Sequence, residues 1–173
     1  MPHESDSAAA SPVSAVRACS ADVEAKDMLR RVYARADAEL ARHAPVCRAC
    51  GQCCRFAKAG HRLLVSPLEL AVLTEASPEK LPVEPGICPY QHNGLCTARE
   101  RRPLGCRVFF CQAPLEECSR LYELYHRNIR RLHAERQLAY VYAELTIALS
   151  QLLNCNQAGQ NAQFTVDTNE RYV

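Results

Sequence analysis

Residues 47–55 read CRACGQCCR, so four of the eight positions from Cys47 to Cys54 are cysteine. Packing alone rarely requires thiols at this density. Closely spaced thiolates are typical of a site in which a bound metal holds the side chains together. Four more cysteines follow further along the chain, at Cys88, Cys96, Cys106 and Cys111. We therefore predict that a cysteine-built site spans the middle third of the sequence.

The chain contains 11 cysteines in 173 residues, which fits either a secreted disulfide framework or thiolate ligands in a reducing compartment. The first 16 residues include Glu4 and Asp6 and lack both a basic start and an apolar core. We therefore expect no secretory signal peptide and a cytoplasmic protein. An odd number of cysteines also suits a disulfide framework poorly. These features favour metal binding.

Two arrangements of ligands are compatible with the spacing of the thiols. Cys47, Cys50 and Cys53 lie three residues apart and Cys88 precedes a proline, a pattern that occurs around four-iron clusters. The same spacing is also found in zinc proteins. A second site of four thiolates would use Cys54, Cys96, Cys106 and Cys111, but we favour one site with additional thiols. In extended chain Cys53 and Cys54 would point to opposite sides, which predicts that they serve different sites.

Basic residues beside these cysteines are candidates for offsetting the charge of a thiolate centre. Arg55 and Arg107 each directly follow a cysteine, and we predict that both contact the bound cofactor. Arg101 and Arg102 fit either this role or an ordinary solvated basic surface. His92 is a weaker candidate ligand.

Local signals predict helices on both sides of the cysteines. Apolar residues recur at helical spacing from Ser20 to about Arg42, and from Pro114 to about Asn154 as one long helix or two joined by a kink. Residues 66–69 read SPLE, a capping box with proline at the first helical position, which predicts a helix to about residue 76. The pair Asn93-Gly94 predicts a tight hairpin.

Together these signals predict a mainly α protein with a small irregular region of strand and loop. A cysteine-rich, metal-centred core would be flanked by an N-terminal helix and by a long C-terminal helix or helix pair. We assign residues 1–19 to a disordered leader and 20–155 to a single metal-binding domain with its cysteine core at 47–111. Residues 156–173 are assigned to a tail.

Composition excludes several classes of function. No run of about 18 apolar residues is present, so we expect no membrane span. A net charge of +2, 6% aromatic residues and the absence of tryptophan give little support for nucleic-acid binding. The sequence shows no phosphate loop or catalytic triad.

The motifs occur in the order found in one known family. The order is CxxCGxCCR from Cys47, SPxE from Ser66, Cys88-Pro89, Gly94-x-Cys96 and RPxxCR from Arg102. Over residues 47–111 the chain resembles the YkgJ-type cysteine-cluster proteins, described as a zinc- or iron-chelating domain and also known as iron–sulfur-cluster proteins. The resemblance implies metal binding at these cysteines. A related domain occurs in flagellin lysine methylases, which implies an enzyme as an alternative.

We therefore predict a metal-binding protein that holds a 4Fe-4S cluster or zinc through the central cysteines, with any protein partner unassigned. Two alternatives stay open. One is an iron–sulfur-dependent redox or group-transfer enzyme, and the other is a zinc-stabilised module that binds a protein or a nucleic acid.

Overall fold

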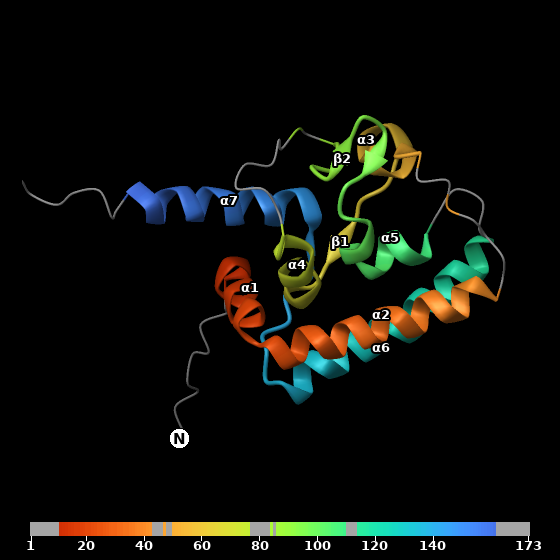
Figure 1. Cartoon of the computed structure of the whole chain (residues 1–173), viewed down its shortest axis with the longest axis horizontal. Coiled ribbons are helices and arrows are strands. Elements are labelled where there is room, and N and C mark those ends of the chain that lie inside the picture. The colour runs from red at the N-terminus through yellow and green to blue at the C-terminus, as the bar shows by residue number, and fades with distance from the viewer. Residues whose placement is uncertain are drawn as a thin grey trace, which may run out of the picture.

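The computed structural model describes residues 11–42, 47, 50–76, 84, 86–109 and 114–161, with side chains up to residue 155 in the last range. Helices dominate these residues, which confirms the mainly α prediction. The two longest, α2 (Val23–Ala41) and α6 (Leu115–Glu135), lie side by side in Figure 1. Buried residues on their facing sides, such as Leu29 and Ile129, are fully enclosed in the core.

The pair α2 and α6 is antiparallel, because each end of one helix is tied to the opposite end of the other. Arg136 binds Asp22 at one end, at 2.9 Å, and Arg120 binds Glu39 at the other, also at 2.9 Å. Asp22 caps α2 by accepting a hydrogen bond from the Ala25 N–H, two residues beyond the predicted cap at Ser20.

Helix α4 (Pro67–Thr74) lies inside the molecule, with every residue from Pro67 to Leu73 buried. A helix that is apolar on all sides is expected in such a position. Its start confirms the predicted capping box: the Glu69 N–H donates to the Ser66 hydroxyl, and the Ser66 N–H donates to the Glu69 carboxylate.

The predicted disordered leader is wrong for residues 12–19, which belong to helix α1 (Pro12–Ala21). This helix packs against α4 and α7 (Leu145–Asn161). Its buried face consists of Ala15, Val16 and Cys19, and the small side chains allow close approach to α4. The domain therefore extends upstream of residue 20. Residues 1–10 lie outside the described part of the chain.

The C-terminal prediction is confirmed as a helix pair, but the connection is not a kink. After α6 the chain takes a positive φ at Gln137, of 54°, and becomes extended. Strand β4 (Ala143–Glu144) then pairs antiparallel with β1 (Leu64–Val65) before α7 begins. Helix α7 also continues past the predicted end near Asn154, so the assigned tail is helical as far as Asn161.

The remaining short elements surround the cysteines. They are the 3-10 helix η1 (Gln52–Cys54), helix α3 (Phe56–Ala59), strands β2 (Gln91–His92) and β3 (Leu95–Cys96), the 3-10 helix η2 (Arg99–Arg101) and helix α5 (Leu104–Val108). Strands β2 and β3 form the predicted hairpin, with φ of 50° at Asn93 and 79° at Gly94. In the part of the chain that is described, no helix is long and apolar enough to cross a membrane.

Candidate metal centre

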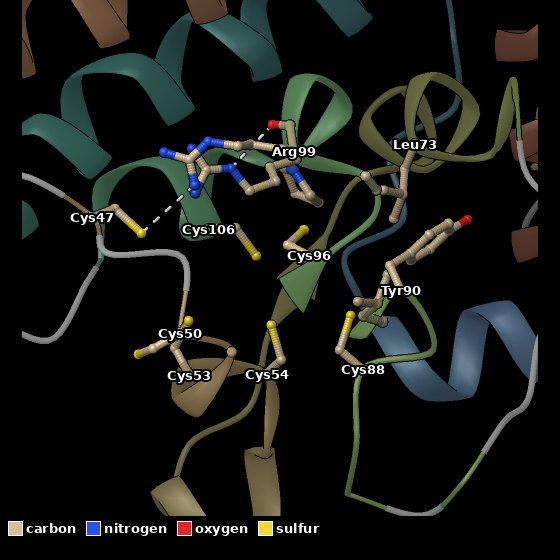
Figure 2. A pocket seen from close by; sticks show the side chains of 15 residues that line it. Cys47, Cys50, Cys53, Cys54, Leu73, Cys88, Tyr90, Cys96, Arg99 and Cys106 are labelled. Carbon is tan, nitrogen blue, oxygen red and sulfur yellow. Dashed lines mark hydrogen bonds between the residues drawn. The ribbon is translucent and has the colours of Figure 1, made fainter. Parts of the chain in front are cut away.

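Seven of the eight predicted ligands line a single cavity of about 50 Å³. They come from four segments, namely the chain before η1, η1 itself, the β2–β3 region and α5. Figure 2 shows several of the sulfur atoms turned toward a common space. The seven are Cys47, Cys50, Cys53, Cys54, Cys88, Cys96 and Cys106. The eighth, Cys111, lies outside the described residues.

The lining of the cavity is mostly apolar, and the cavity is larger than one water molecule. Leu73 of α4, Tyr90 and Leu145 contribute to its lining. A single water occupies roughly 10–15 Å³ measured in this way, so the space accommodates a body of more than one heavy atom.

Backbone contacts hold the cysteine segments together. The Cys88 N–H donates to the Cys54 carbonyl at 2.7 Å, which joins η1 to the chain that enters the hairpin. Gly51 has a φ of 65°, and a Cβ at this position would lie 2.6 Å from the Gly94 carbonyl oxygen. Glycine is therefore required where the first cysteine segment crosses the hairpin turn.

The prediction that Cys53 and Cys54 serve different sites assumed extended chain. That assumption is wrong, because the two residues form a 3-10 turn. In this turn successive side chains are rotated by about a third of a circle, whereas in extended chain they are rotated by about half a circle. Both thiols line the cavity. Their adjacency is therefore compatible with a single centre.

The thiols act on one another electrostatically. The Cys53 thiol donates a hydrogen bond to Cys54, which raises the pKa of Cys53 and lowers that of Cys54. A hydrogen bond from Cys54 to Cys88, together with burial, still leaves the pKa of Cys54 raised to about 12. Burial first, and then the neighbouring Cys54 and Cys53, raise the pKa of Cys106.

The same cavity is lined by Arg99 and Arg102. The sequence pointed to Arg102, together with Arg101, but not to Arg99. The Arg99 guanidinium lies 4.0 Å from the Cys47 sulfur, as the dashed line in Figure 2 marks. The Arg102 Nε–H donates to the Arg99 carbonyl at 3.1 Å. The pKa of Cys53 is raised mainly by its hydrogen bond to Cys54 and that of Cys106 mainly by burial, and the charge of Arg102 offsets part of each rise. Arg101 instead donates to the Leu73 carbonyl at the end of α4.

The two predicted cofactor contacts occupy different environments. Arg55 is exposed and does not line the cavity. Arg107 is buried, with its guanidinium paired with Asp37 and 4.2 Å from the centre of the Tyr33 ring. Its Nε–H donates to the Arg102 carbonyl at 2.8 Å. Arg107 thus fastens α5 to α2 and holds the backbone of a cavity arginine.

Other candidates are placed away from the cavity. His92 is exposed in the hairpin, and His61 packs against the edge of the Phe56 ring. Cys118 is buried in the core. Cys19 is fully buried in α1, where burial raises its thiol pKa to about 12. His133 is only 1% exposed.

Eight of the described cysteines are free thiols, namely Cys19, Cys50, Cys53, Cys54, Cys88, Cys96, Cys106 and Cys155. Among the described residues, no group of three or more His, Cys, Asp or Glu side chains is already arranged to hold a metal ion.

A second cavity, of about 650 Å³, adjoins the first. Cys53, Cys54, Cys88 and Cys106 line both. No sequence motif indicates this cavity, because its walls come from α3, α5 and the start of α6, which are distant in sequence.

Comparison with protein-family models, with curated proteins and with solved structures finds no match for this chain.

Proposed function

We propose that the protein binds a metal through the central cysteines, as zinc or as an iron–sulfur cluster. The observation that carries the proposal is the convergence of seven cysteine side chains from four segments on one cavity. Packing alone rarely gathers cysteines in this way. Ligation would release their protons and couple binding to folding of the surrounding loops.

The chemistry of the donors fits both groups. The lining contains sulfur donors and no histidine or carboxylate among the described residues. Zinc in structural sites and iron–sulfur clusters both accept four thiolates. Either would leave about two net negative charges, which the guanidinium groups of Arg99 and Arg102 are placed to offset.

One centre is favoured over two. The two four-cysteine sets suggested by spacing share one cavity, because all seven of their described members line it. Cys54 and Cys106, from one set, interact electrostatically with Cys53 of the other. The resemblance to YkgJ-type cysteine-cluster proteins supports metal binding at these cysteines.

Anaerobic purification of the full chain tests the proposal. Zinc, iron and acid-labile sulfide are measured per chain, and the visible spectrum is recorded. About one zinc and no colour would identify a zinc site, whereas a brown protein with equal iron and sulfide would identify a cluster. A folded protein that holds neither group, and takes up neither on reconstitution, would contradict it.

The second candidate function is an iron–sulfur-dependent redox or group-transfer enzyme. The larger cavity favours it, because a volume of about 650 Å³ is in the range typical of small-molecule sites and its lining includes four of the cavity thiols. Brown protein whose visible spectrum responds to a small molecule would support this candidate over a purely structural centre.

A further inference from the structure

The larger cavity combines an apolar interior with a cationic edge. Its apolar lining includes Phe56 and Leu63, both buried, and Phe109 and Leu115, which are exposed at 37% and 73%. Three basic side chains, Lys58, His61 and Arg62, also line it and are exposed, so they lie where the cavity meets solvent.

No carboxylate appears among the described residues that line this cavity. Arg62 approaches Glu144 only at 3.9 Å and its side chain is 83% exposed, so the contact neutralises it weakly. The edge of the cavity is therefore positively charged, whereas the protein as a whole carries a net charge of only +2.

Four cysteines, Cys53, Cys54, Cys88 and Cys106, line both cavities. A molecule in the larger cavity would therefore lie next to cysteines of the proposed metal centre. Its polar group would remain with the basic side chains at the edge. The cavity thus has apolar surface near the cysteines and basic side chains at its solvent edge.

We propose that this cavity binds an amphipathic organic anion, with its apolar part against the cysteine centre and its carboxylate or related group at Lys58 and Arg62. This first part of the proposal, the ligand site, is argued from the cavity alone. The second part is that the bound ligand perturbs the metal centre, and it rests on the proposed function.

The chain contains no tryptophan, so one introduced tryptophan reports on a single place. Phe109→Trp puts the reporter in the cavity wall, and Ile147→Trp puts it on α7, where Ile147 is 54% exposed and lines neither cavity. Sodium decanoate below its micelle concentration is titrated into each variant as purified, after its metal content and circular dichroism have been measured.

We expect a saturable change in fluorescence for Phe109→Trp and none for Ile147→Trp. Adding Lys58→Gln and Arg62→Gln to the Phe109→Trp background should weaken binding about tenfold, while adding Arg17→Gln on α1 should not. Decanol, which lacks the charge, should bind less tightly than decanoate. A second assay does not depend on the Phe109→Trp substitution. Decanoate or decanol displaces a fluorescent anilinonaphthalene sulfonate from protein that keeps Phe109, and the same charge variants are compared.

Three results would overturn the site: no saturable binding in either assay, an equal response from both reporters, or affinity unaffected by removal of the two charges. If metal is present, decanoate should also change its visible spectrum or its rate of release to a chelator. Decanoate binding without that change would overturn the second part. Decanoate binding to a protein that holds no metal, and takes up none on reconstitution, would leave the ligand site intact and contradict the proposed function instead.

Discussion

At the scale of single residues, Glu69 links two helices through its carboxylate. One oxygen accepts from the Ser66 N–H at 2.8 Å and the other from the Leu104 N–H at 2.9 Å. The side chain is buried, and burial raises the pKa of this carboxyl despite those hydrogen bonds. The start of α4 is thereby fixed to the start of α5, which carries Cys106.

Glu69→Ala removes the acceptor of two buried N–H groups, and each unsatisfied group costs about 1–3 kcal/mol. We expect the free energy of unfolding in urea to fall by about 2–4 kcal/mol. Glu69→Gln retains an oxygen acceptor and should lose less. Glu123→Ala, at an exposed position of α6, is the control. A Glu69→Ala protein within about 0.5 kcal/mol of the original would show that the carboxylate is dispensable.

The sequence predicted the local half of this arrangement and not the distant half. SPLE at 66–69 indicates a capping box because cap and acid are three residues apart. Nothing local relates Glu69 to Leu104, which lies 35 residues further on. The same limit applies at the centre: spacing identified the cysteines, but the approach of Arg99 to Cys47 depends on the tertiary fold.

At the scale of elements, the α2–α6 pair is joined at both ends by acid–base contacts. The hydrogen bond from Arg136 is the main cause that lowers the pKa of Asp22, and that from Arg120 lowers the pKa of Glu39. The Tyr125 hydroxyl donates a second hydrogen bond to Glu39, at 2.8 Å.

Lowered pKa values in the folded state stabilise the protein at pH values above the ordinary ones of 3.8 for Asp and 4.5 for Glu. That contribution is lost as the pH falls through the folded values. We expect the double variant Asp22→Asn with Glu39→Gln to be less stable at pH 7, and to lose less stability than the original between pH 5 and pH 3. The comparison between variants removes any common effect of metal release.

Urea unfolding at a series of pH values measures this difference, with the exposed Glu123→Gln as the matched control. Parallel pH profiles for the double variant and the original protein would contradict the assignment of acid sensitivity to these two contacts.

The crossing of Gly51 over the hairpin turn gives a second prediction at this scale. Gly51 and Gly60 both have positive φ, of 65° and 70°, but only at Gly51 would a Cβ meet other atoms within 4 Å. Gly60→Ala should cost about 1–2 kcal/mol from backbone strain alone. Gly51→Ala should cost clearly more and should also reduce the metal content, because it displaces Cys50 and Cys53. Equal stability and equal metal content in the two variants would contradict this interpretation of the crossing.

At the scale of the whole molecule, the fold class followed from sequence while its boundaries did not. Helix α1 was missed because residues 11–21 are mostly small, and its burial depends on a neighbouring helix supplied by residues 67–74. The strand-containing connection between α6 and α7 was not predicted, because no Pro or Gly marks it. There the pairing of β4 with β1 prevails over helical propensity.

The cysteine centre is held by loops and short elements, whereas α2 and α6 have a core of their own. Removing bound metal with a chelator should therefore increase hydrogen exchange over residues 50–60 and 86–106, and much less over α2 and α6. It should also lower the melting temperature. Unchanged exchange and melting temperature, after metal loss has been verified, would contradict a structural role for the centre.

The central claim is that the clustered thiols form one metal centre. Its most direct measurement is the metal-to-protein ratio of anaerobically purified Cys54→Ser, Cys88→Ser and Cys106→Ser, compared with Cys155→Ser. Cys155 is exposed on α7 and does not line the cavity. We predict a marked loss of metal, or of affinity for it, in the first three and an unchanged ratio in Cys155→Ser. The same metal content and affinity in all four folded variants would contradict the claim.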